Sequence, residues 1–270
     1  MKNAGAVVFA VIAVAACKSG APAPKADAPA SEAATVGIEY IAHASFRIHT
    51  EAGATLLIDP YASRVWLGYD FPEELLDADA VVITHPHYDH DYGEFIGRTV
   101  PWTEADTVLR DPGRFEVADA VLTGVAGKHA DPYGEEFGQK NTIWIIELDG
   151  LRIVHLGDNG PLTDEVVAAL GRVDVLMAPI DAEEHILTYA AVAQMREQLS
   201  PAVVVPTHYR LPDLESSPDS PTDLGTIEPW LDTQQAVIRA GGNRYELSAD
   251  TLPDTPSVLV FEHSPLVVAN

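Results

Sequence analysis

One short stretch limits what this chain can fold into more than any other. Residues 84–91 read THPHYDHD, which places three histidines and two aspartates within eight positions. Imidazole and carboxylate groups are the ligands that borderline metal ions prefer, and crowding them is unfavourable unless a cation or water satisfies them. The stretch directly follows the apolar run AVVI, so we expect a metal-binding loop that leaves a buried strand.

The rest of the chain is large enough for one substantial core. It has 270 residues, of which 47% are hydrophobic, and a mean hydropathy of +0.03, which favours one domain with short additions. The formal net charge of -25 argues against a nucleic-acid partner or an anionic membrane surface, since both would be repelled. It still allows a small anionic substrate, because bound metal reverses the sign of the charge locally.

The N-terminus has the layout of a signal peptide rather than of a folded element. Residues 1–16 contain an early lysine and an apolar run that is too short for a membrane span. The sequence VAAC, which ends at Cys17, resembles a bacterial lipobox, in which the cysteine becomes the lipidated first residue. We therefore expect a lipid-anchored protein of the bacterial cell envelope, facing the periplasm or the exterior. The alternative is an incidental or buried cysteine after a plain signal.

A flexible tether is predicted between the anchor and the domain. Residues 17–35 are rich in Ala, Pro and Ser, and no large apolar residue occurs before Val36. Such a stretch buries too little apolar surface to offset the entropy lost on ordering. The globular domain is therefore predicted to span residues 36–270. Cys17 is the only cysteine, so no disulfide forms within the chain.

Short strands dominate the predicted domain, with two helices in its second half. Alternating or continuous apolar runs predict strands at 37–50, 55–60, 77–85, 120–129, 141–148, 151–158, 173–180, 202–208 and, as an edge strand, 257–263. Asp149 and Gly150 predict a tight hairpin. Helices are predicted at 162–171, with Thr163 as N-cap and Gly171 as its end, and at 189–200. This order predicts layered sheets with helices outside.

Polar residues fall where these strands end. The strands VVITH, VHLGD, LLIDP and VVVPTH all end in His or Asp, and such ends gather at one rim of a sheet. Within THPHYDHD, two histidines two positions apart can face one ion, and the next Asp and His can face a neighbouring ion. His129, Asp158 and His208 offer further ligands, and Asp158 is the natural bridge because each carboxylate oxygen can face one ion.

The ordered set of motifs resembles the metallo-β-lactamase-fold hydrolases. HxHxDH after an apolar strand, a later GD after another strand and a late PTHY carry the resemblance. IAHASFRI, LLIDP, GQKNTIWIIELDGLRIVHLGDNG and VDVLMAPI are most similar to the branch around ascorbate-6-phosphate lactonase. The resemblance covers residue 36 to the C-terminus. It implies an α+β fold: an αββα sandwich of two mixed sheets packed face to face, with helices outside.

Site roles follow from the resemblance, residue by residue. It implies a first metal site of His85, His87 and His129, a second of Asp89, His90 and His208, and a bridging ligand, Asp158. It also implies that Asp59 is an outer carboxylate that orients the histidine loop, which metal-binding histidines usually require. The alternative for Asp59 is a turn residue before proline.

Three other histidines need separate interpretations. His43 matches a position that the branch often fills with His near the mouth of the site, where structural and functional roles are both open. Strand alternation puts His155 on the face opposite Asp158, which favours a core or outer role. His185 lies in DAEEH, residues 181–185, where relatives usually have a glycine-rich stretch. That departure either reshapes the pocket, adds a ligand or begins a helix, and it weakens any transfer of the lactonase substrate.

The predicted function is hydrolysis of a small ester, lactone or phosphoester by a metal-bridging hydroxide. Two divalent ions are expected, Zn²⁺ from the histidine-rich ligand set, with Mn²⁺ or Fe as alternatives. The leaving group takes its proton from Asp89, His43 or water. One alternative is an envelope lipoprotein that binds metal as a binding or scaffolding module without catalysis. Another is a nuclease, which would more comfortably carry a basic groove.

Overall fold

The fold comes from a computed structural model that describes residues 35–62, 66–95, 108–181, 186–211, 213–214 and 224–269. The predicted signal peptide, Cys17 and the tether up to residue 34 lie outside the described residues, as does His185. Among the described residues, every helix is too short or too polar to span a lipid bilayer.

The first sheet has six strands in the order β13-β1-β2-β3-β4-β5. Its members are β1 (Val36–Ala42), β2 (Ser45–His49), β3 (Thr55–Ile58), β4 (Ala80–Val82), β5 (Val108–Leu109) and β13 (Arg244–Leu247). Pairing is antiparallel from β13 to β3 and parallel from β3 to β5. The single strand predicted at 37–50 is wrong, because the chain turns at His43, whose φ is +56°, and β2 then pairs back on β1.

The second sheet has eight strands in the order β12-β14-β11-β10-β9-β8-β7-β6. Its members are β6 (Gly113–Val117), β7 (Ala120–Lys128), β8 (Lys140–Leu148), β9 (Leu151–His155), β10 (Val175–Pro179), β11 (Val203–Thr207), β12 (Val237–Arg239) and β14 (Ser257–Val260). Pairing is parallel from β12 to β9 and antiparallel from β9 to β6. Both sheets are therefore mixed, as predicted.

One strand position in this sheet differs from expectation. The strand at the end of the chain was predicted to be an edge strand, but β14 lies between β11 and β12. The edge is β12, three residues long and mostly exposed, so neither its length nor its pattern distinguishes it from a loop. All four residues of β14 are buried, which fits its interior position in the sheet.

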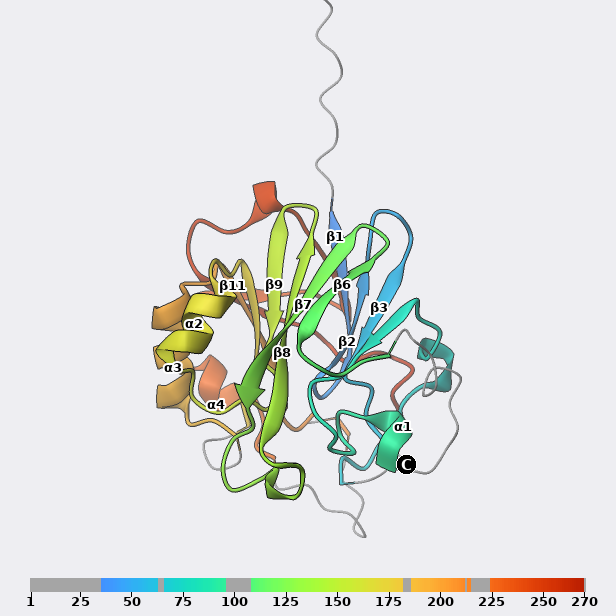
Figure 1. The fold of residues 1–270 in the computed structure, drawn as a ribbon. Coiled ribbons are helices and arrows are strands. Elements are labelled where there is room, and N and C mark those ends of the chain that lie inside the picture. Colours follow the sequence, from blue (N-terminus) through green and yellow to red (C-terminus); the bar gives the residue numbers. More distant parts are fainter. Residues whose placement is uncertain are drawn as a thin grey trace, which may run out of the picture. The chain divides into compact units, whose positions relative to one another are not determined.

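The two predicted helices are present and lie outside the second sheet. They are α2 (Asp164–Leu170) and α3 (Tyr189–Leu199), on the side of β9 to β11 that faces away from the first sheet (Figure 1). The Thr163 side chain accepts a hydrogen bond from Val166 N, and Gly171 ends α2 with a φ of +62°. Shorter helices are α1 (Tyr92–Phe95), α4 (Glu228–Leu231) and the 3₁₀ turns Glu73–Leu75, Glu135–Phe137 and Ala249–Thr251.

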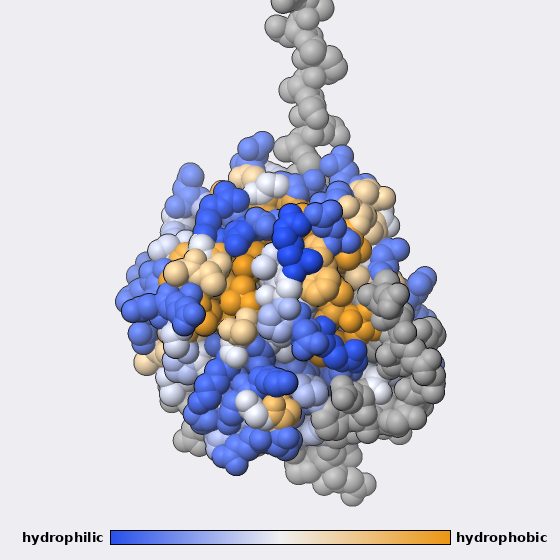
Figure 2. All heavy atoms as spheres, viewed as in Figure 1, coloured by the Kyte–Doolittle hydropathy of each residue, from blue (hydrophilic) through white to orange (hydrophobic). Residues whose placement is uncertain are grey.

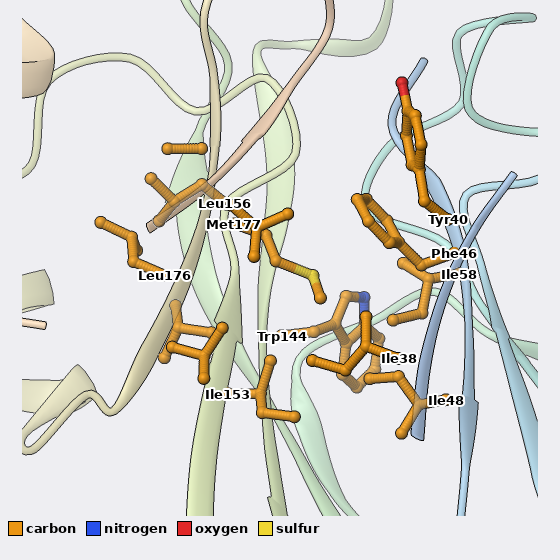
Figure 3. Close-up of a cluster of buried hydrophobic side chains, with 14 of the residues drawn as sticks. Ile38, Tyr40, Phe46, Ile48, Ile58, Trp144, Ile153, Leu156, Leu176 and Met177 are labelled. Atoms are coloured by element: carbon orange, nitrogen blue, oxygen red, sulfur yellow. The ribbon is translucent and has the colours of Figure 1, made fainter. Parts of the chain in front are cut away.

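The core lies between the two sheets. Ile38, Tyr40, Phe46 and Ile58 from the first sheet face Trp144, Ile153 and Met177 from the second (Figure 3), and all seven are at most 1% exposed. Trp144 Nε1 donates to the carbonyl of Ile83 over 2.9 Å, so a side chain of one sheet holds the backbone that leads into the histidine loop. Packing and site geometry are therefore coupled.

Hydrophilic residues are prominent on the visible face of the domain. In the coloured part of Figure 2 they surround apolar residues that are grouped near the centre of the view. The composition, with 41 acidic residues against 16 basic ones, makes the chain strongly anionic. A small neutral substrate is unaffected by this charge, whereas a polyanion would be repelled.

Candidate metal centre

Strand ends bring the predicted site residues to one place. The histidine loop follows β4, Asp59 follows β3, His129 follows β7, Asp158 lies three residues after β9, and His208 follows β11. All seven predicted ligands form two compact groups, in each of which the candidate ligand atoms lie within 4.8 Å of one another. The groups are His85, His87, His129 and Asp158, and His43, Asp89, His90 and His208.

In the first group, imidazole nitrogens converge beside a carboxylate. His85 Nε2 lies 3.1 Å from His87 Nδ1 and 3.7 Å from Asp158 Oδ2. His129 Nε2 also lies 3.7 Å from Asp158 Oδ2. Three of the four residues are buried, and His87 is partly exposed at the pocket. Three imidazoles and one carboxylate oxygen make a donor set suited to a zinc-like ion.

The second group contains the predicted Asp89, His90 and His208, together with His43. His90 Nε2 and His208 Nε2 each lie 3.5 Å from Asp89 Oδ2, and His43 Nε2 lies 3.1 Å from the same oxygen. All four residues are buried. His43 is completely buried behind Asp89 and against His208, with ring centroids 4.3 Å apart.

Asp158, a member of the first group, also contacts the second group. Its Oδ1 is 3.2 Å from His90 Nε2, and its Oδ2 is 3.2 Å from His208 Nε2. The same Oδ2 faces the histidines of the first group, as described above. A carboxylate in this position can serve ions on both sides, which is the geometry that the predicted bridging role requires.

Hydrogen bonds behind the cluster fix which ring nitrogen faces inward. Thr84 Oγ1 donates to Asp59 Oδ2 over 2.8 Å, so it accepts from His85 Nδ1 at 3.0 Å. His90 Nδ1 donates to Asp59 Oδ2 over 2.8 Å, and His129 Nδ1 donates to the carbonyl of Ala130 over 2.9 Å. In the neutral rings, Nε2 therefore presents its lone pair to the cluster, as a metal ligand must.

Asp59 accepts several of the hydrogen bonds that lie behind the ligands. It is fully buried and, besides His90 and Thr84 Oγ1, it accepts hydrogen bonds from Thr84 N and His155 Nε2, each over 2.8 Å. Burial opposes its charge, but the adjacent histidines and these bonds hold its pKa below the usual range of an aspartate. His155 thus acts through Asp59, one of the roles that alternation favoured. Thr84 was not predicted, although it directly precedes the HxHxDH motif.

Charges within the cluster oppose one another strongly. Burial penalises the charge of His90, but the carboxylates of Asp158, Asp89 and Asp59 outweigh it and raise the His90 pKa to about 10. Burial likewise opposes the charge of Asp158, yet the nearby histidines hold its pKa well below normal. By contrast, burial and its histidine neighbours lower the pKa of His85. Without metal, the cluster thus holds anionic carboxylates against a protonated His90, and a bound cation would take the place of that proton.

This arrangement fits a bound cation. Among the residues that the structure describes, the buried ionisable groups other than tyrosines are Asp and His alone. His129 Nε2 is buried and makes no hydrogen bond within that part of the chain. A buried polar atom without a partner is costly, and a divalent ion among these donors would satisfy it and offset the carboxylate charge. The residues present therefore suit a metal ion.

A small pocket opens on the cluster. It has a volume of about 280 Å³ and is lined by Trp66, His87, Tyr88, Asp89, His129, Tyr133, Asp158 and Ile186. Asp89, predicted to be catalytic, is among these residues, whereas His43 is not. Tyr88 lies within the histidine loop itself, whereas Trp66, Tyr133 and Ile186 belong to no sequence motif, and folding brings them to the metal side chains. A larger cavity of about 420 Å³ lies on the other side of His85, between β7, β8 and the loop after β5.

Known families and structures resemble this chain over most of its length. The model of one family, the "Beta-lactamase superfamily domain", matches residues 37–208. A protein of Myxococcus xanthus named "UPF0173 metal-dependent hydrolase" is 29% identical over 84% of this chain and 91% of its own length. A protein of the same name from Pyrococcus horikoshii is 28% identical over 68% of this chain and 89% of its own.

A solved structure shares the architecture. It is a protein of Thermotoga maritima described as a Zn-dependent hydrolase of the metallo-β-lactamase superfamily, with a TM-score of 0.60 and 23% identity. The alignment covers 84% of this chain and 98% of that protein. At this identity the likeness establishes the fold. The names of these three proteins do not specify an ascorbate-6-phosphate lactonase, so the finer resemblance to that branch stays a prediction.

Proposed function

We propose a dinuclear site for this chain, which belongs to the β-lactamase superfamily domain family and is a metal-dependent hydrolase of the metallo-β-lactamase fold. The protein is proposed to hold two divalent ions and to cleave a small ester, lactone or phosphoester. One observation carries the proposal: Asp158 contacts both groups of ligand atoms, within 3.2 Å of both His90 and His208 and facing His85 and His129.

The proposed ligands are those that the sequence named. His85, His87, His129 and Asp158 would hold one ion, and Asp89, His90 and His208 would hold the other, with Asp158 reaching it as well. Zn²⁺ suits the histidine-rich first group best. When bound, the pair of ions supplies a hydroxide near neutral pH and polarises the oxygen of the bond to be cleaved.

Protein side chains do the remaining work. Asp89 lines the pocket, and its pKa is held well below normal because neighbouring histidines outweigh burial, so it is ionised at neutral pH. As an ionised carboxylate it would hold the second ion and accept a hydrogen bond from the attacking water, and the leaving oxygen would take its proton from water. His43 Nε2 donates to Asp89 Oδ2 over 3.1 Å and holds that carboxylate in place, a positioning role in preference to direct proton transfer.

Pocket size and walls narrow the substrate. A volume of about 280 Å³ admits a small molecule, and Trp66, Tyr88, Tyr133 and Ile186 offer flat, apolar walls. The described lining residues include no lysine or arginine, so a phosphoester's extra charge would rely on the ions alone. Neutral carboxylic esters and lactones with a flat apolar part are therefore the preferred substrates within the proposed class.

The experiment combines metal content with activity. Elemental analysis of the purified chain should give two ions, and the His85→Ala/Asp158→Ala variant should lose them along with hydrolysis of nitrophenyl esters and lactones. His263→Ala is the matched control, because His263 lies outside both groups and its Nδ1 faces the carbonyl of Ser264. Two ions without hydrolysis of any ester, lactone or phosphoester would favour the binding-module alternative. A folded protein without metal would refute the proposal.

An envelope location completes the proposal. The VAAC pattern that ends at Cys17 supports a lipid anchor, and the composition of residues 17–35 supports a tether between that anchor and the hydrolase domain. Such an arrangement would keep the site outside the cytoplasm, where it meets small molecules that reach the envelope. The partners proposed are therefore the small-molecule substrate and, through the lipid, the membrane.

A further inference from the structure

The histidines of the two groups differ in what lies behind them. In the first group, His85 Nδ1 faces the Thr84 hydroxyl at 3.0 Å and His129 Nδ1 faces a backbone carbonyl at 2.9 Å. In the second group, His90 Nδ1 faces the Asp59 carboxylate at 2.8 Å and His208 Nδ1 lies 3.4 Å from the Asp181 carboxylate. Neutral oxygens thus lie behind His85 and His129, whereas buried carboxylates lie behind His90 and His208.

The two carboxylates behind the second group are buried, which strengthens their electrostatic effect on the histidines. The Asp59 and Asp181 side chains are 0% exposed. The first group also has one carboxylate neighbour, Glu136, 3.2 Å from His87 Nε2, but its side chain is 65% exposed. Water screens an exposed charge, whereas a buried charge acts on its neighbours through a lower dielectric. The second group therefore has the stronger electrostatic support for a cation.

The backbone fixes Asp181 beside His208. Strands β10 and β11 pair in parallel, with Pro179 opposite Thr207, and Ile180 N donates to the carbonyl of Thr207 over 2.8 Å. Asp181, which follows Ile180, and His208, which follows Thr207, are therefore carried to the same edge of the sheet. Asp181 Oδ2 also accepts from Ile186 N over 2.9 Å, which holds its carboxylate in this orientation.

We propose that Asp181 is a positioning residue for the second metal position, acting through His208. Its carboxylate oxygen faces His208 Nδ1 from 3.4 Å, and this negative charge favours the tautomer with the proton on Nδ1, which leaves the Nε2 lone pair free for the ion and more basic. It also adds a buried negative charge near the second ion and none comparable near the first. Loss of this charge therefore weakens one of the two ions selectively. This inference rests on the proposed dinuclear site.

The test is a chelator-competition titration of the metal-free full chain with Zn²⁺. Two ions should bind to the wild type. In Asp181→Asn, which keeps an acceptor for Ile186 N, one ion should bind roughly 10–100-fold more weakly and the other within about threefold of the wild type. Asp181→Glu should restore most of the lost affinity, because it restores the charge. Restoration by the acid is a readout that a purely structural role would not give.

Two comparison variants make the result specific. Asp174→Asn removes a buried carboxylate at the opposite end of β10, where Asp174 Oδ2 accepts from Arg152 N, and should leave both Zn²⁺ affinities unchanged. Glu136→Gln removes the exposed carboxylate beside His87 and should weaken binding by less than about threefold.

The titration distinguishes failure of the proposed Asp181 role from failure of the proposed dinuclear site. If the wild type binds two ions and Asp181→Asn weakens neither, or weakens both equally, the role of Asp181 is refuted while the dinuclear site stands. If the wild type binds fewer than two ions, the dinuclear proposal fails instead. If Asp181→Asn does not fold without metal, Asp181→Glu is the variant that tests the proposal. Weak binding of one ion by a folded Asp181→Glu variant would refute the role of the charge.

Discussion

Asp59 Oδ2 lies 2.8 Å from His90 Nδ1, and both side chains are fully buried. The same oxygen accepts from His155 Nε2 and from the Thr84 hydroxyl, so one carboxylate joins β3, β9 and the histidine loop. Asp59, for which the resemblance implied an orienting role and a turn residue was the alternative, therefore also holds the two sheets together at their site edge. Stability and metal binding share this contact.

Asp59→Asn should destabilise the metal-free protein by about 2–4 kcal/mol, because an amide directs N–H groups at donors that the carboxylate accepted and leaves buried groups unpaired. Urea unfolding of chelator-treated protein measures this change. Asp250→Asn, at an exposed position, is the control and should fall within about 0.5 kcal/mol of the wild type. Equal stability of the two variants would contradict the role of Asp59 in joining β3, β9 and the histidine loop.

His43 gives the metal-free protein a defined pH response. Burial and the charge of His208 outweigh Asp89 and lower the His43 pKa to about 4. Between pH 6.5 and 4 the unfolded chain therefore takes up a proton that the folded chain refuses, and stability falls as pH falls. The His43 contribution is fully present above pH 6.5, and its loss is at most about 3 kcal/mol.

The variant His43→Gln tests this response. Glutamine keeps a donor for Asp89 but does not titrate, so the decline in unfolding free energy from pH 6.5 to 4 should become shallower. The measurement is urea unfolding across that range in chelator-treated protein, with His263→Gln as the control. An equally steep decline in His43→Gln would mean that other groups dominate the acid response.

The absence of a side chain at Gly157 lets its backbone lie close to the Thr84 side chain. A Cβ at this position would lie 2.5 Å from Thr84 Oγ1, and the backbone φ is +54°. Gly157→Ala should therefore displace Thr84, weaken the support of His85 and Asp59, and lower both stability and Zn²⁺ affinity. Gly171→Ala, with a φ of +62° and no atom within 4 Å of the added Cβ, isolates the backbone cost of about 1–2 kcal/mol.

Thermal unfolding and Zn²⁺ titration of both glycine variants make the comparison. Gly157→Ala should lose more stability than Gly171→Ala and should bind Zn²⁺ at least several-fold more weakly. Gly171→Ala should keep the wild-type Zn²⁺ affinity, because its site lies at the end of α2. Identical losses in the two variants would show that Thr84 tolerates the added methyl group.

Cys17 should determine where the full chain is found in bacterial cells. We expect the wild type in the membrane fraction, released by detergent and not by high salt, because an acylated cysteine partitions into lipid. Cys17→Ser should move to the soluble fraction and keep its hydrolase activity. A wild type that is soluble after removal of residues 1–16 would favour a plain secretory signal.

Much of the fold was predictable because local patterns agree with it. Apolar runs located most of the strands, Asp149 and Gly150 marked the hairpin through positive φ values, and Thr163 and Gly171 bounded α2. The errors occurred where local pattern says nothing of neighbours. Nothing within residues 37–50 indicates the turn at His43, and a short exposed strand such as β12 has no signature that reveals which strand it covers.

The chemistry of the centre could be predicted from residue types alone: the ligands, their spacing in THPHYDHD and their position after apolar strands. Metal preference and strand periodicity are local properties of a sequence. Which carboxylate lies behind which histidine, by contrast, depends on how the strands are arranged in space. Asp181 and His208 are 27 positions apart in the chain, but parallel pairing of β10 and β11 carries them to the same edge. Such long-range contacts depend on strand order and sheet packing, which no local pattern encodes.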